Sequence, residues 1–227
     1  MKNIYTCLFF TLLYTTSYGQ KFSTSFDAQL AVPQGDYKKV NPDAGFGLRA
    51  NVLYKPLVEA PLKVGIEIGI QEKGSATEYF SGYVYGYYDQ FKVTASSNIF
   101  SLMFLARFQS QKLHKIKPFM DVSAGWNVFF STVSVERLTY YSSYNDSYSN
   151  STKGKWALSY GASGGLDIPL NKADDIGLEL KGSYLIGSNS RYLADPYIDN
   201  NGNASFVEKE SRTDMLIPQA GIRITIK

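Results

Sequence analysis

The chain has 227 residues, of which 44% are hydrophobic, 15% aromatic and 19% charged, so it is too rich in apolar residues to be disordered and long enough for only one or two domains. Its formal net charge is +3, with lysines and arginines spread along the sequence, which excludes the basic patch of a nucleic-acid-binding protein. One histidine and one cysteine leave almost no ligands for a protein-held zinc ion, and we expect no metal and no other cofactor.

The first segment has the pattern of a secretory signal peptide. A short basic start over 1–3 precedes an apolar and aromatic stretch over 4–18, and small residues follow around Gly19. This order of charge, apolar stretch and small-residue exit is typical of a signal peptide, and about 15 apolar residues are too few to span a membrane comfortably. We predict a signal peptide over 1–19 and a single barrel domain over 20–227.

Alternation of apolar and polar residues dominates the rest of the chain. Over 62–70 every second residue is Leu, Val or Ile, and the residues between them are Lys, Gly or Glu. A period of two predicts a β-strand with one apolar and one polar face. The pattern recurs and predicts eight strands and no amphipathic helix, with the strands at 22–32, 44–55, 62–73, 98–109, 120–130, 156–168, 176–186 and 219–226.

The connections between these strands alternate in length. The short ones cover 56–61, 110–118 and 169–175, and the long ones cover 33–43, 74–97, 131–155 and 187–215. Parts of the long ones can extend the strands as protruding hairpins. Short turns on one side, long loops on the other and an even strand count are the layout of an outer-membrane barrel. The predicted fold is therefore all-β: an eight-stranded antiparallel up-and-down transmembrane β-barrel with short periplasmic turns and long extracellular loops.

The polar faces of the strands are rich in Gly and Ser and carry five acids and five bases. In an eight-stranded barrel the interior is just wide enough to be filled by side chains, so we expect these charges to pair and to plug the lumen. On a soluble barrel the same balanced charges would line a solvated outer face. The predicted lumen charge network consists of Asp27, Arg49, Lys63, Glu67, Arg107, Asp121, Asp167, Glu179, Lys181 and Arg223.

Aromatic residues on the apolar faces favour the membrane barrel over a secreted soluble barrel or sandwich. If the first strand runs outward from the periplasm, aromatics fall at two levels. The inner level holds Phe22, Tyr54 and Phe108, and the outer level holds Phe46, Phe100, Phe130, Trp156 and Tyr184. Two such girdles match the aromatic belts of membrane barrels.

The final strand, Gln219–Ile226, resembles the terminal assembly signal of outer-membrane proteins, although it lacks a terminal aromatic residue. Together with the signal peptide, the eight strands and the glycine-spaced hairpins, this strand makes the mature chain similar to the outer-membrane β-barrel families of Bacteroidetes-type Gram-negative bacteria. These families are labelled porin-like or PorT-like. In size the chain is similar to OmpA/OmpX-type barrels. The resemblance implies an integral protein of the cell outer membrane that contacts outer-membrane lipid and lipopolysaccharide and is inserted by the barrel-assembly machinery. It implies no active-site residues.

Tyrosines crowd the predicted extracellular loops. Tyr set among Ser, Gly and Asn is the composition of adaptable binding surfaces, which indicates a surface glycan or a protein as partner. The alternative is that the rings pack the hairpins or lie at the level of the lipopolysaccharide. The candidate recognition residues are Tyr83, Tyr85, Tyr87, Tyr88, Tyr140, Tyr141, Tyr144 and Tyr148, and Tyr192 and Tyr197 lie in the fourth long loop.

The sequence offers no clear catalytic group. The sole histidine, His114, lies among lysines in a short turn that we expect to be solvated, where it lacks the setting of a nucleophile–base pair. We therefore expect a non-enzymatic barrel with a plugged lumen that serves envelope structure or surface recognition. The alternatives are a small pore or transporter for solutes and a secreted lipocalin-like ligand binder. Pairing of the lumen charges would exclude solutes, whereas ten or more strands would open a channel.

Overall fold

The computed structural model describes residues 21–56, 60–84, 87–110, 116–138, 147–151 and 154–226. Several residues singled out from the sequence lie outside these ranges, namely the predicted signal peptide over 1–19, His114, Tyr85, Tyr140, Tyr141 and Tyr144. Tyr83, Tyr87 and Tyr88 are described by their backbone alone.

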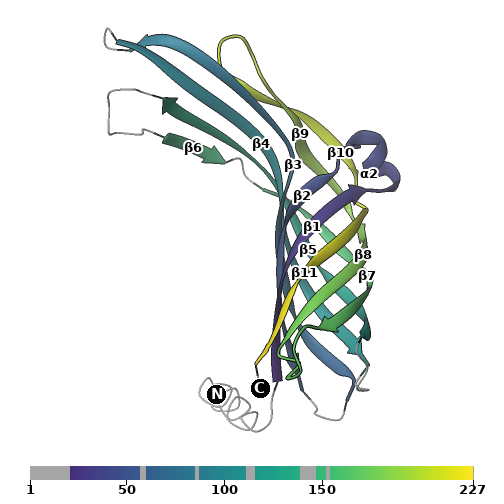
Figure 1. Cartoon of the computed structure of the whole chain (residues 1–227). Coiled ribbons are helices and arrows are strands. Elements are labelled where there is room, and N and C mark those ends of the chain that lie inside the picture. Colours follow the sequence, from purple (N-terminus) through teal and green to yellow (C-terminus); the bar gives the residue numbers. More distant parts are fainter. Residues whose placement is uncertain are drawn as a thin grey trace, which may run out of the picture.

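Eight antiparallel strands close into a ring, which confirms the fold class predicted from the sequence (Figure 1). The last strand returns to pair with the first, from Phe22 opposite Ile226 to Pro33 opposite Met215, so the wall has no free edge. The ring consists of β1 (Lys21–Pro33), β2 (Gly45–Lys55), β3 (Leu62–Val84), β4 (Tyr87–Gln109), β5 (Lys117–Leu138), β7 (Lys155–Pro169), β8 (Ile176–Gly187) and β11 (Met215–Ile226). Within the described part of the chain, no helix is long and apolar enough to cross a membrane.

The two faces of the wall are opposite in polarity, as β5 illustrates. Met120 and Val122 point outward and are 67% and 57% exposed, whereas Asp121 and Asn127 point inward and are at most 1% exposed. Successive side chains of a strand alternate between faces, so the period of two in the sequence becomes an apolar outside and a polar inside.

Glycines on the inner face let the strongly curved wall close. A Cβ on Gly65 would lie 1.9 Å from the carbonyl oxygen of Val52, and one on Gly125 would lie 2.0 Å from that of Leu102. Backbone atoms of neighbouring strands therefore occupy the space of a side chain at these positions. Only glycine fits this close approach.

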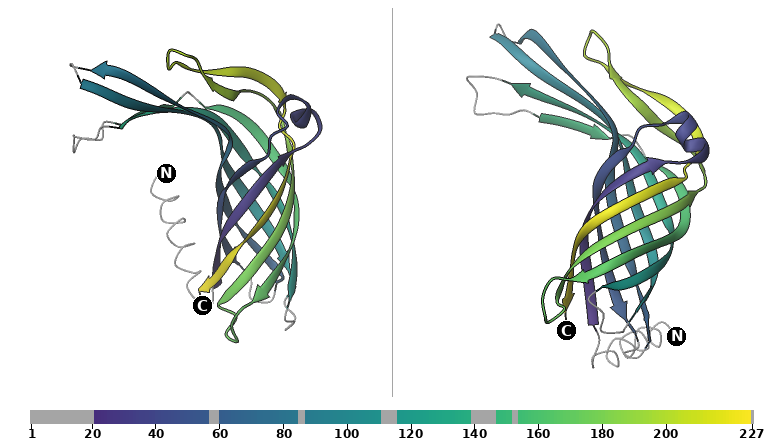
Figure 2. Two further views of the ribbon diagram at one scale, coloured as in Figure 1. Left: turned by 45° about the horizontal axis from the view of Figure 1, so that its top comes forward. Right: turned by 45° about the vertical axis from the view of Figure 1, so that its right-hand side comes forward.

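Two pairs of strands continue beyond the barrel as an extended sheet. The pairing of β3 with β4 runs on to Val84 opposite Tyr87, and the pairing of β4 with β5 runs on to Gln90 opposite Leu138. A short strand, β6 (Ser147–Ser151), adds to the outer part of β5. We call this part of β3, β4, β5 and β6 the wing; it leans away from the barrel axis in every view (Figures 1 and 2). Much of the long connections over 74–97 and 131–155 is thus strand.

The remaining long connections close over the same end of the barrel. The connection over 187–215 forms a separate two-stranded sheet of β9 (Asn189–Ile198) and β10 (Ala204–Arg212), and the last wall strand begins at Met215, earlier than predicted. β9 contacts β3, β4, β5 and β7.

The expectation of no helix was wrong. The connection over 33–43 contains α2 (Gly35–Val40), which packs against β1 and β10. The helix begins after extended Gln34, has Asp36 in its first turn and two lysines in its last, and ends where the Asn41 amide donates to the Tyr37 carbonyl. Six residues are fewer than two turns, too few for a helical period to show in the sequence.

Candidate functional site

The middle of the lumen is built around Arg107 of β4. Its guanidinium binds two carboxylates bidentately: Nε and Nη2 donate to Asp121 at 2.8 and 2.9 Å, and Nη1 and Nη2 donate to Glu179 at 2.7 and 2.8 Å. Asp121 is its register partner on β5, whereas Glu179 reaches in from β8 across the barrel. The Phe119 ring lies 3.8 Å from the guanidinium carbon. Such forked pairs are the strongest ionic hydrogen bonds in proteins, and here they join opposite walls.

A third carboxylate, Glu67 of β3, extends this cluster. It accepts from Arg49 on β2 and from Lys181 on β8, both at 2.5 Å. Lys181 also lies 3.5 Å from Asp121, so the second cluster joins the first. All of these side chains are buried. The lumen is therefore crossed by one continuous ionic network that ties β2, β3, β4, β5 and β8 together.

Asp27 does not join that network. It lies opposite Arg49 in register, but its Oδ2 accepts a hydrogen bond from Ser25 at 2.6 Å, and it makes no ion pair with another described residue. Arg49 in turn keeps its Nε and Nη2 nitrogens buried without a hydrogen-bond partner among the described residues. Among the described residues, the lumen charges thus do not pair one to one.

The remaining predicted charges lie toward the end with the short turns. Arg223 donates from Nε to Asp167 at 2.9 Å and from Nη2 to Asp174 at 2.8 Å. Gln109 donates to the other oxygen of Asp167 at 2.8 Å. Lys63 is half-buried at this end and makes no ion pair with a described residue.

A ring of amides and hydroxyls lies above the ionic network. Ser101 donates to Asn127 and Asn127 donates to Ser159, both at 2.7 Å, which links β4, β5 and β7. Gln29 donates to Gln71 at 3.0 Å, which links β1 and β3. The Ser-rich polar faces of the sequence thus form neutral hydrogen bonds across the wall.

The end of the lumen with the long connections is closed by an apolar cluster that we call the cap. Tyr37 of α2, Phe129 of β5 and Tyr192 of β9 are 0%, 5% and 2% exposed, and their ring centroids lie 5.2 to 6.3 Å apart. Edge-to-face and stacked rings at these distances pack favourably. The other members are Ala31, Ile99, Met103, Ala157, Leu185, Ala194, Met215 and Ile217.

Sequence reasoning missed the cap. Tyr192 was expected on an exposed loop, but it is buried, and its hydroxyl bonds to that of Ser211 at 2.9 Å. A signal was present: Ile99 and Met103, two members of the cap, stand on the otherwise polar face of their strand and interrupt the alternation.

No residue that the structure describes forms a hydrogen bond with the Tyr37 hydroxyl in the cap. Burial raises the pKa of this hydroxyl well above its ordinary value of 10.0, with a smaller contribution from Tyr192. Two lysines bind the connection over 33–43 that carries Tyr37. The Lys73 ammonium lies 4.9 Å from the centre of the Tyr37 ring and donates to the Asp43 carbonyl, and Lys209 donates to the Val40 carbonyl at 2.7 Å.

The wing carries a regular array of hydroxyl groups on one face. The first row of register partners runs across all four strands as Ser75, Ser96, Thr132 and Ser151, and the second as Thr77, Thr94, Ser134 and Ser149. These residues are exposed or half-buried. On β4 and β5 they continue the outward face of the barrel wall.

Two tyrosines of the wing have described side chains. Tyr79 lies on the hydroxyl-rich face and is 65% exposed, and Tyr148, a predicted recognition residue, lies on the opposite face and is 67% exposed. In the part of the chain that the structure describes, no group of three or more His, Cys, Asp or Glu is placed to hold a metal ion.

No family model matches the chain, and no curated protein matches it in sequence. Among solved structures, it is similar to Neisserial surface protein A, with 11% identity, a TM-score of 0.46 and coverage of 91% of this chain and 96% of that one. It is also similar to a major outer membrane protein from Thermus thermophilus, with 14% identity, a TM-score of 0.43 and coverage of 92% and 100%. For Ail, the attachment invasion locus protein of Yersinia pestis, the identity is 12%, the TM-score is 0.37 and the coverage is 91% and 97%. Conclusions about function therefore rest on the residues of this chain.

Proposed function

We propose that this chain is an integral outer-membrane protein of a Gram-negative bacterium, non-enzymatic and closed to solutes, that presents its wing at the cell surface. The observation that carries the proposal is the inverted distribution of side chains. Phe26 and Leu48 on the outside of the wall are each 62% exposed, whereas Arg107 and Glu179 inside are each 1% exposed. In water this would leave a continuous apolar belt uncovered, and the hydrocarbon core of a bilayer covers such a belt.

Outward aromatic residues at both ends of the belt support a membrane position. Phe22 and Tyr54 pair at the end with the short turns, with ring centroids 5.3 Å apart. Phe46, Trp156 and Tyr184 are 64%, 66% and 45% exposed on the wall nearer the other end. Aromatic rings favour the two polar boundaries of a bilayer, so these levels delimit the segment in contact with lipid.

The contents of the lumen support a barrel closed to solutes. The ionic network, the hydrogen-bonded amides and hydroxyls and the cap together occupy the interior of an eight-stranded barrel, which has room for side chains but no aqueous channel. The buried carboxylates of Asp121 and Glu179 are both held by Arg107, so neither is available as a general base.

The wing supports a role in binding sugar. Within each of its two rows, hydroxyls on neighbouring strands are about 4.8 Å apart, and each hydroxyl can both donate and accept hydrogen bonds. Their face continues the outward face of the wall, and the wing leans away from the axis (Figure 2), so this face looks toward the membrane surface around the barrel. The sugar part of lipopolysaccharide, which lies there in the outer leaflet, is the partner we propose.

Migration on an SDS gel with and without boiling tests the membrane barrel. The mature chain extracted from membranes is expected to migrate as a compact band until it is heated, and to conduct no steady current in a planar bilayer. Recovery in the soluble fraction without a heat shift would contradict the membrane position, and a large steady conductance would contradict the closed lumen.

Binding to immobilised lipopolysaccharide tests the role of the wing separately. Replacing one row, in the variant Thr77→Val, Thr94→Val, Ser134→Ala and Ser149→Ala, is expected to weaken binding at least tenfold while the heat shift is kept. The matched control is Glu78→Ala with Asn150→Ala, on the opposite face of the same sheet. Equal binding by both variants would remove lipopolysaccharide as the partner of this face.

A further inference from the structure

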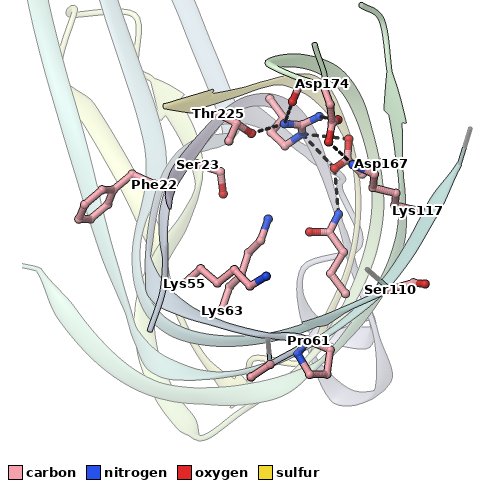
Figure 3. Close-up of a pocket in the computed structure, with 13 residues that line it drawn as sticks. Phe22, Ser23, Lys55, Pro61, Lys63, Ser110, Lys117, Asp167, Asp174 and Thr225 are labelled. Carbon is pink, nitrogen blue, oxygen red and sulfur yellow. Dashed lines mark hydrogen bonds and ion pairs between the residues drawn. The ribbon is translucent and has the colours of Figure 1, made fainter. Parts of the chain in front are cut away.

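A cavity of about 220 Å³ opens at the end of the barrel with the short turns (Figure 3). It is lined by Ser23 near the start of β1, by Thr225 near the end of β11 and by Asp174 in the turn between β7 and β8. At roughly 30 Å³ per water molecule, this volume equals about seven waters. It has room for one small anionic group and the atoms attached to it.

The carboxylates that line this cavity already have partners. Asp167 and Asp174 both accept hydrogen bonds from Arg223, at 2.9 and 2.8 Å. Asp174 also pairs with Lys117, and Asp167 also accepts from Gln109 at 2.8 Å. The negative charges of these two acids are therefore balanced by residues on the same side of the cavity.

The other side of the cavity carries donors. Lys63, Lys55 and Ser23 point into its open middle (Figure 3). Among described residues, Lys63 has no ion-pair partner and the Ser23 hydroxyl has no hydrogen-bond partner. The open side of the cavity thus presents the ammonium group of Lys63 and a hydroxyl donor that the two carboxylates do not bind.

We propose that this cavity binds a phosphate group, with Lys63 as the principal ligand and Ser23 as a further donor. A phosphate has more acceptor oxygens than a carboxylate and carries a full negative charge or more, which suits an ammonium group and a hydroxyl. Lysine binds phosphate as a point charge. In the proposed membrane orientation this end faces the periplasm, so the group comes either from a soluble phosphate or from the headgroup of an inner-leaflet phospholipid.

Titration with inorganic phosphate tests the site in the full mature chain, folded in non-ionic detergent and followed by NMR. The amide signals of Ser23 and Thr225 are expected to shift saturably. Lys63→Gln should weaken the response at least tenfold, and Lys63→Arg should retain most of it. Lys172→Gln, an exposed lysine at the same end of the barrel, is the matched control and should leave the response unchanged. Each variant is first checked for the heat shift on an SDS gel.

Two outcomes would overturn the proposal: the absence of a saturable shift, or equal loss in Lys63→Gln and Lys172→Gln, which would indicate general screening by salt. Nanodiscs separate the two sources of phosphate. In phosphatidylglycerol discs, a Lys63-dependent shift that is present without added phosphate supports the lipid headgroup, whereas a shift that appears only when inorganic phosphate is added supports a soluble ligand. Neither readout depends on lipopolysaccharide binding, so failure here leaves the proposed role of the wing standing.

Discussion

The middle of the lumen and its capped end are filled in different ways. The middle holds forked ion pairs between strands of the wall, such as Arg107 with Asp121 and Glu179. The cap is apolar and is completed by Tyr37 and Tyr192, which come from connections outside the ring. A wall residue is positioned by the register of its strand, whereas a cap residue depends on how its connection folds back over the barrel.

The middle and the cap differ because ion pairs and apolar rings are stable in different surroundings. In the middle, every inward position is fixed on a closed sheet, so charged groups can meet at short distances and offset the large cost of their burial. At the cap the segments arrive from α2 and β9, and apolar rings tolerate small shifts better than ion pairs do. We therefore expect the middle to control global stability and the cap to open locally.

Removing the central cation has the largest expected effect. Arg107→Ala leaves Asp121 and Glu179 buried without their main partner, and we expect the free energy of unfolding to fall by about 3–5 kcal/mol. Urea unfolding in micelles measures this loss. The control is Arg191→Ala, which breaks an exposed pair with Glu210 and should cost less than about 1 kcal/mol. Equal losses would mean that the ionic network does not control the stability of the barrel.

Removing the central ring of the cap has a smaller and more local effect. Tyr37→Ala removes a fully buried aromatic side chain, a change worth roughly 3 kcal/mol. Because α2 can detach without unfolding the wall, we expect this loss of stability to appear as about hundredfold faster hydrogen exchange of the α2 amides. Exchange in β4 and β5 should be unchanged. Tyr197→Ala, at a position of β9 that is 53% exposed, should change neither. Faster exchange throughout the barrel would show that cap and wall unfold together.

The smallest effect concerns the Tyr37 hydroxyl. Its raised pKa means that the folded cap favours the protonated form, so this stabilisation is complete below about pH 10 and is lost as the pH rises toward the folded-state pKa. Tyr37→Phe removes an unpartnered polar group, should change stability at neutral pH by no more than about 1 kcal/mol, and should keep the cap closed at higher pH. Hydrogen exchange of residues 35–41, corrected for the intrinsic rate at each pH, compares the two proteins. Identical pH profiles would contradict this role of Tyr37.

Much of the wall could be predicted from the sequence because a strand exposes its period directly. The alternation over 62–70 reappears in β3 with Glu67 inside and Ile66 and Ile68 outside. The partners inside could not be predicted, since they depend on which strands face one another across the ring. Glu179 binds Arg107, 72 residues away, while Asp27 makes no ion pair with Arg49 although the two are register partners.

The number of wall strands, their inward and outward faces and the charged residues of the lumen could be assigned from the sequence, because they follow from a two-residue period and closure of the sheet. The use of the connections depends on tertiary packing. A helix of six residues and the hairpin of β9 and β10 have no strong period of their own, and they take their places by burying Tyr37 and Tyr192 over the open end. The wing likewise depends on long-range pairing, which aligns hydroxyls from four separate strands into rows.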